Sequence, residues 1–143
     1  MKKIFKEENI KEIAKNILER VSKGKKYGAT IIALSGDLGA GKTTLTKEIG
    51  RILGIKENIV SPTFVIMKIY KTKNENFKKL IHIDAYRLDS YLELLKIGWE
   101  KIILEKENLI IIEWPENVLG DGITKHHKIE ILHIDSMTRS IKF

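Results

Sequence analysis

The chain has 143 residues, contains no cysteine and carries a formal net charge of +7. This length suits one domain, and the lack of cysteine excludes disulfides, thiolate zinc sites and a cysteine nucleophile. No apolar run approaches the roughly 20 residues of a membrane helix, and the N-terminus turns acidic at Glu7 and Glu8, where a signal peptide would turn apolar. We therefore expect a soluble, cytoplasmic protein that does not bind membranes. The positive charge would attract phosphate-rich ligands, although lysines scattered over a solvated surface produce the same excess.

Hydrophobic periodicity predicts helices and strands that alternate along the chain. Apolar residues recur at spacings of three and four over 10–21, which indicates an amphipathic helix ended by Gly24. The elements expected after it are a buried strand over 31–34, a helix over 43–53, strands over 63–70 and 80–83, a helix over 92–104 with a break at Gly98, a buried strand over 109–112, and strands over 128–134 and 140–143. Continuous apolar strands imply a sheet covered on both faces. The predicted fold class is therefore α/β, with a largely parallel central sheet in one domain over 1–143.

A glycine-rich segment joins the first buried strand to the next helix. Residues 36–43, Gly-Asp-Leu-Gly-Ala-Gly-Lys-Thr, match the phosphate-loop pattern G-x-x-x-x-G-K-[ST], of which roughly 0.005 accidental matches are expected in such a chain. Glycines let main-chain N–H groups turn inward around an anion, and the following helix adds positive dipole density. We expect Lys42 to reach the β- and γ-phosphates and Thr43 to coordinate Mg²⁺. The segment thus predicts a nucleoside triphosphate site in a P-loop NTPase-like three-layer sandwich.

Two carboxylates follow predicted strands and are candidates for the metal and the chemistry. Asp84 comes after the strand over 80–83, and Glu113 after the strand over 109–112. In a parallel sheet both would emerge at the edge that carries the phosphate loop. The alternatives are a turn-forming or helix-capping Asp84 and a Glu113 that is merely a surface residue. His82, inside an apolar run, is interpreted as a hydrogen-bonded sheet histidine.

Several further motifs resemble those of one known family. Ser-Pro-Thr-Phe stands at 61–64, His-Ile-Asp-Ala-Tyr-Arg-Leu at 82–88, Ile-Gly at 97–98 and Ile-Glu-Trp-Pro-Glu at 112–116. With the glycine-rich loop they cover about residues 30–116, and the first two are far more specific than the loop alone. The sequence resembles the TsaE family of small bacterial ATPases, which are required for threonylcarbamoyladenosine modification of tRNA.

This resemblance implies ATP and Mg²⁺ as cofactors and assigns roles to the candidate residues. Mg²⁺ would be bound by Thr43 and Glu113, and Asp84 would lie near the γ-phosphate, so that the expected catalytic residues are Asp84, Lys42 and Glu113. The loop at 61–63 would sense the nucleotide. The residues expected to bind ATP are Asp37, Leu38, Gly39, Ala40, Gly41, Lys42, Thr43 and Thr44, joined by Arg139 near the C-terminus.

The resemblance also implies partners. TsaB and TsaD would form a complex with this chain, which would hydrolyse ATP only weakly alone and would reach tRNA indirectly through that complex. Two other functions remain open. A small-molecule kinase could use the same loop, but it usually needs an acceptor-binding domain and an arginine-rich lid. A nucleotide-gated RNA-binding protein would fit the charge, but the sequence lacks an aromatic RNA-binding motif.

Overall fold

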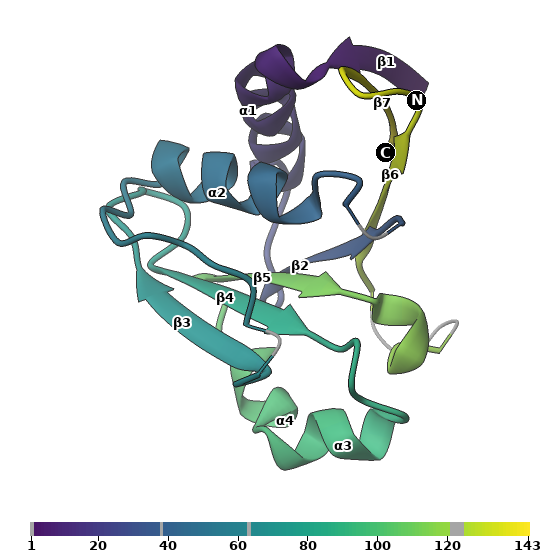
Figure 1. The fold of residues 1–143 in the computed structure, drawn as a ribbon. Helices are drawn as coiled ribbons and strands as arrows, with labels where there is room; N and C mark the ends of the chain where they lie inside the picture. Colours follow the sequence, from purple (N-terminus) through teal and green to yellow (C-terminus); the bar gives the residue numbers. More distant parts are fainter. Residues whose placement is uncertain (1, 38, 63, 121–124) are drawn as a thin grey trace.

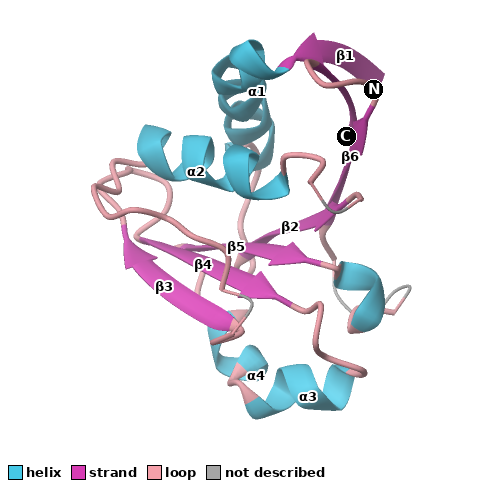
Figure 2. Cartoon of the chain, in the orientation of Figure 1, coloured by secondary structure: helices cyan, strands magenta, loops and turns pink. Residues whose placement is uncertain are grey.

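The computed structural model describes residues 2–37, 39–62, 64–120 and 125–143. Within them a seven-stranded sheet forms the middle layer, in the order β1-β7-β6-β2-β5-β4-β3 (Figures 1 and 2). The strands are β1 (Lys2–Lys6), β2 (Thr30–Ser35), β3 (Met67–Lys71), β4 (Lys79–Asp84), β5 (Asn108–Glu113), β6 (His127–His133) and β7 (Thr138–Lys142). The helices are α1 (Ile10–Ser22), α2 (Lys42–Ile52), α3 (Tyr91–Lys96) and α4 (Trp99–Ile102), with 3-10 turns η1 (Glu7–Asn9) and η2 (Pro115–Asn117).

The centre of the sheet is parallel and its margins are antiparallel. Strand β2 pairs in parallel with both β5 and β6, and β5 pairs in parallel with β4. The β1–β7, β6–β7 and β3–β4 pairs are antiparallel. Helices α1 and α2 cover one face of the sheet, and α3 and α4 cover the other (Figure 1). This is the predicted α/β sandwich with a largely parallel central sheet.

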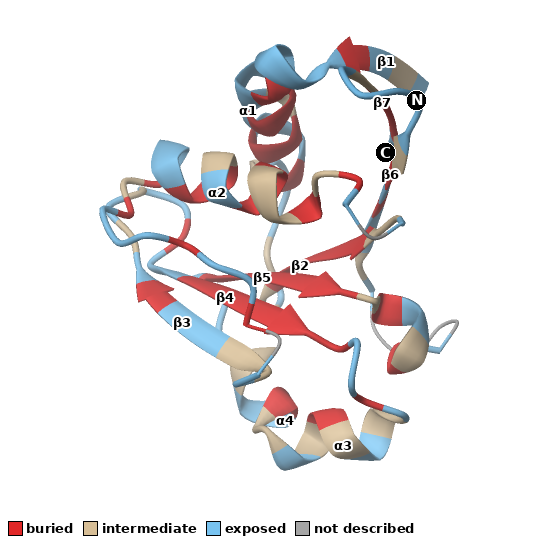
Figure 3. Ribbon diagram, in the orientation of Figure 1, coloured by how far each residue is buried: buried red, intermediate tan, exposed pale blue. Residues whose placement is uncertain are grey.

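The central strands are buried on both faces, which explains their unbroken apolar sequences. All six residues of β5 are buried (Figure 3). Its side chains alternate between the layers: Leu109 and Ile111 pack with α1 and α2, whereas Ile110 and Ile112 pack with α3 and α4. Covering both faces removes the polar alternation of a half-exposed strand. The same alternation places the last residue of β5, Glu113, on the α1 and α2 side.

Helix boundaries follow the predicted signals closely. The predicted break at Gly98 separates α3 from α4, and Gly98 has the positive φ of 93° that glycine adopts readily.

None of the helices within the described ranges combines the length and the apolar character that crossing a bilayer requires.

The predicted strand over 63–70 is wrong in its first half, since β3 begins only at Met67. The carbonyl oxygen of Pro62 accepts the N–H groups of Val65 and Ile66 at 3.1 and 2.6 Å, so these residues form a turn rather than a ladder. Ile66 has a φ of 69°, outside the extended region. Thr63 lies outside the described residues.

The sequence does not predict β1, which pairs with β7 along the margin of the sheet. Its five residues hold only two apolar side chains, Ile4 and Phe5, among three lysines, and Phe5 alone is buried. Such a segment becomes a strand because β7 offers it a partner, not because of its own pattern.

Candidate functional site

The glycine-rich loop leaves the carboxyl end of β2 and leads directly into α2. Gly36 has a φ of 147°, and a Cβ at this position would lie 2.1 Å from the carbonyl oxygen of Ile131 in β6. Only glycine therefore lets the chain turn so close to β6. Gly41, with a φ of 106°, caps the N-terminus of α2 and aims the first N–H groups of that helix at the loop. Leu38, expected to bind the nucleotide, lies outside the described residues.

The Lys42 side chain points back into this loop and is 7% exposed. Its Nζ donates hydrogen bonds to the carbonyl oxygens of Gly36 at 2.5 Å and of Asp37 at 3.4 Å. The same ammonium lies 4.4 Å from the ring centroid of Trp114. A buried ammonium needs such partners or an anion. An anionic ligand held by the loop would therefore find this charge already in place.

Asp84 and Glu113 are adjacent at the same edge of the sheet. They are the last residues of β4 and β5, are paired in register, and are 5% and 3% exposed. Neighbouring strands lie about 5 Å apart, so the two carboxylates are close neighbours. Glu113 is therefore not the surface residue that the sequence left as an alternative. Both side chains belong to the sheet face that α2 covers, because β4 and β5 alternate in step.

Asp84 also forms a turn, in agreement with the alternative interpretation of this residue as turn-forming. Its Oδ1 accepts the N–H of Tyr86 at 3.0 Å, and its Oδ2 accepts the hydroxyl of Ser61 at 3.1 Å. The turn fixes the direction of the carboxylate. The Ser61 hydrogen bond ties it to the segment that precedes β3.

Glu113 forms a buried pair with His82, which lies two residues before Asp84 in β4. The Nε2 of His82 lies 2.9 Å from Oε2 of Glu113, and the two side chains are 0% and 3% exposed. The prediction of a hydrogen-bonded histidine is confirmed for this nitrogen. Among the described residues, the buried Nδ1 has no hydrogen-bond partner. The pair restrains the Glu113 side chain and presents it at the carboxyl end of β5.

Lys42, Asp84 and Glu113 line one cavity of about 360 Å³, whereas His82 lies outside its lining. The loop and α2 contribute Gly39, Gly41, Lys42, Thr43 and Thr44, and the strand ends contribute Asp84 and Glu113. Three expected binding residues do not line this cavity, namely Asp37, Ala40 and Arg139. Asp37 is exposed, whereas Ala40 is fully buried.

Arg139 instead supports the loop from behind. Its Nε donates a hydrogen bond to the carbonyl oxygen of Ala40 at 3.2 Å, and its NH1 donates to that of Asp135 at 2.7 Å. Its NH2 lies 3.8 Å from a carboxylate oxygen of Glu7, which does line the cavity. The guanidinium thus joins β7, the glycine-rich loop and the N-terminal segment.

Two aromatic side chains form a further wall of the cavity. The rings of Tyr86 and Trp114 have centroids 5.1 Å apart and are tilted by 56°. The sequence places both residues in motifs but does not predict their contact. Trp114 has a φ of 56°, and this turn brings its ring back over Lys42.

The donor set suits a magnesium-bound phosphate chain better than a metal held by protein alone. Among the described residues, no group of three or more His, Asp or Glu side chains could hold a metal ion. Mg²⁺ usually takes one or two protein oxygens together with substrate phosphates. Thr43 and Glu113 offer a hydroxyl and a carboxylate in the cavity that Lys42 also enters. The residues present therefore fit Mg²⁺ once phosphate supplies the remaining ligands.

Comparisons with known proteins point to one family. Residues 4–141 match the family model described as threonylcarbamoyl adenosine biosynthesis protein TsaE. The tRNA threonylcarbamoyladenosine biosynthesis protein TsaE of Rickettsia typhi is 46% identical over 87 residues, which are 60% of this chain and 57% of that protein. The protein of the same name from Streptomyces coelicolor is 38% identical over 86 residues, again 60% and 57%. The chain thus spans little more than half the length of these relatives.

A solved structure resembles the whole chain. The crystal structure of Bacillus subtilis YdiB superposes with a TM-score of 0.68 at 26% sequence identity. The match covers 99% of this chain and 83% of that one. The similarity therefore includes the margins of the sheet, which lie outside the most specific motifs.

Proposed function

Since this chain belongs to the TsaE family, which acts in the biosynthesis of threonylcarbamoyladenosine in tRNA, we propose that it is an ATPase of that process. It binds Mg-ATP in the cavity beside the glycine-rich loop and hydrolyses it slowly. The observation that supports this most strongly is the convergence of Lys42, Thr43 and two buried carboxylates on one cavity.

Each side chain has a distinct task in this proposal. Lys42 exchanges its hydrogen bonds to loop carbonyls for the β- and γ-phosphates, and the first N–H groups of α2 complete the cradle. Thr43 and Glu113 hold Mg²⁺, with Glu113 kept in place by His82. When bound, Mg²⁺ neutralises the negative charge that develops on the phosphates.

Asp84 acts at the γ-phosphate end of the cavity. Its carboxylate orients the attacking water, and the Ser61 hydroxyl holds that carboxylate in the absence of nucleotide. Because Ser61 belongs to the segment before β3, exchange of this hydrogen bond on nucleotide binding changes the conformation of that segment. Residues 61–63 thereby act as a nucleotide-sensitive switch.

The described lining of the cavity contains no arginine, which supports the proposed slow turnover. None of the described residues that line the cavity is an arginine, and Arg139 is engaged behind the loop by Ala40 and Asp135. An arginine supplied by a partner accelerates comparable hydrolases by about 10³ to 10⁵. We therefore propose that TsaB and TsaD complete the site, and that tRNA is reached through their complex.

Partner-dependent stimulation tests this function directly. Mixing the chain with TsaB and TsaD from the same organism is expected to raise the rate of phosphate release by about tenfold or more. The Lys42→Ala variant should bind the partners yet show no rise. An unchanged rate, in a mixture whose complex is seen by size-exclusion chromatography, would contradict the proposal.

The proposed magnesium ligand gives a second prediction. Glu113→Gln keeps the shape and the possibility of a hydrogen bond to His82 but removes the charge, so that Mg²⁺ should strengthen ATP binding less. We expect the affinity for Mg²⁺ to fall by at least about tenfold, which is the loss that a disturbed metal site shows. Calorimetry with ATP, with and without Mg²⁺, measures this difference. Glu116→Gln, an exposed change three residues away, is the matched control; equal Mg²⁺ dependence in both variants would exclude Glu113 as a ligand.

A further inference from the structure

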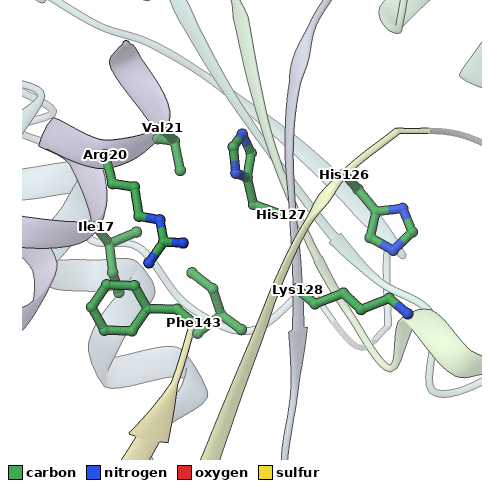
Figure 4. Close-up of a pocket in the computed structure, with 8 residues that line it drawn as sticks. Ile17, Arg20, Val21, His126, His127, Lys128 and Phe143 are labelled. Carbon is green, nitrogen blue, oxygen red and sulfur yellow. The ribbon is translucent and has the colours of Figure 1, made fainter. Parts of the chain in front are cut away.

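A second cavity, of about 320 Å³, lies where α1 and β7 end and β6 begins (Figure 4). Its lining includes Ile17, Arg20 and Val21 from α1, His127 and Lys128 from β6, and Phe143. It shares no described lining residue with the nucleotide cavity. A ligand here would therefore leave the proposed ATP site accessible.

The cavity opens at an interrupted margin of the sheet. Strand β7 pairs with β6 only from Glu130 to His133. Among the described residues, the stretch over 127–129 has β2 on one side and no strand on the side of β7. The margin of β6 is therefore accessible at its first residues.

Basic side chains lie on both sides of this open margin. Figure 4 shows Arg20 and His127 on one side of β6, whereas His126 and Lys128 extend from the other, as the alternation of a strand requires. Burial, and then the positive charges of Lys26 and Arg20, lower the pKa of His127. No described lining residue of this cavity is acidic. The surroundings of His127 thus favour an anionic ligand.

An aromatic ring and an apolar wall accompany the charges. The Arg20 guanidinium lies 5.4 Å from the ring centroid of Phe143, and Ile17 and Val21 form the floor. Single-stranded nucleic acids bind sites of this type, because cations track the phosphates while bases stack on aromatic rings and arginine planes. The family acts on a modification of tRNA, which favours RNA among anionic polymers.

We propose that this second cavity binds single-stranded RNA, with phosphates on Arg20 and Lys128 on either side of the β6 margin and a base against Phe143. No continuous motif reveals the site, since its residues come from three distant segments. The proposal goes beyond ATP hydrolysis and does not depend on it, because the two cavities are separate.

Charge-matched variants test the site. The probe is a fluorescein-labelled single-stranded RNA of about 12 nucleotides, followed by fluorescence anisotropy at several salt concentrations. Arg20→Gln/Lys128→Gln is expected to weaken binding by about tenfold and to reduce the slope of log affinity against log salt by about 0.7 for each lost phosphate contact. Lys11→Gln/Lys15→Gln removes the same charge from exposed positions of α1 and should bind as the wild type does.

Further measurements distinguish this site from general charge effects. Phe143→Leu keeps an apolar side chain and should weaken binding about fivefold or more through lost stacking, with an unchanged salt slope. Saturating Mg-ATP should not displace the RNA. If the double variant does not fold, the single variant Arg20→Gln, at an exposed position, tests the site instead. Its ATP affinity and its circular dichroism spectrum check that it is folded.

Three outcomes would overturn the proposal. They are no binding of the RNA by the wild type at physiological salt, equal losses in the two charge-matched double variants, and displacement of the RNA by ATP. The last would locate the RNA in the nucleotide cavity. None of these results bears on whether the chain hydrolyses ATP.

Discussion

Lys42→Ala is expected to abolish measurable ATP binding, with a loss in affinity of about 100-fold or more, equivalent to about 3 kcal/mol. The ammonium is almost fully buried at the loop and is held there by the carbonyl oxygens of Gly36 and Asp37. No other side chain of the described cavity lining carries a positive charge. Its removal leaves the phosphates without a positively charged side chain from the described lining. Calorimetric titration with a non-hydrolysable ATP analogue measures the change.

The stability of the same variant separates binding from folding. A buried ammonium is costly even with carbonyl partners, so the melting temperature of Lys42→Ala should stay unchanged or rise. Lys47→Ala, an exposed change on the same helix, is the control and should bind ATP normally. Wild-type affinity in the Lys42 variant would remove the glycine-rich loop from the proposed site.

Asp84→Asn is expected to reduce ATP turnover by about 100-fold or more while changing ATP affinity little. The amide can still accept the N–H of Tyr86, so the turn that Asp84 closes is preserved. It lacks the negative charge needed to orient and activate a water molecule. Phosphate release in the presence of the partners, compared with equilibrium binding of ATP, measures the two effects separately.

The matched control for this variant is Asp89→Asn, an exposed change in the same connection between β4 and α3. It should turn over ATP at the wild-type rate. If Asp84→Asn remains active as well, Asp84 is a structural turn residue and another group must orient the water. A joint loss of binding and turnover would instead indicate that Asp84 contacts the nucleotide or its metal directly.

Local sequence patterns predict the parts of the fold that depend on neighbouring residues. The period of apolar residues predicts α1, continuous apolar runs predict β2 and β5, and Gly98 marks the break between α3 and α4. The glycine-rich loop belongs to this class, because a close turn against β6 requires glycine at Gly36. In these cases the backbone conformation is set within a few residues.

Contacts between distant segments can be identified only from the tertiary structure. Strand β1 exists because β7 pairs with it, and Arg139 meets Ala40 across 99 residues of sequence. The pairing of His82 with Glu113 depends on the register of β4 against β5, which neither strand encodes alone.

The amino-acid sequence by itself therefore determined the class of fold, the phosphate-loop motif and the two carboxylates that end buried strands. Only the tertiary structure decided that Arg139 lies behind the loop, that Trp114 covers Lys42, and that a basic cavity opens beside β6. The physical reason is that periodicity and backbone angles are local properties. The order and register of strands depend on the free energy of the whole packed sheet.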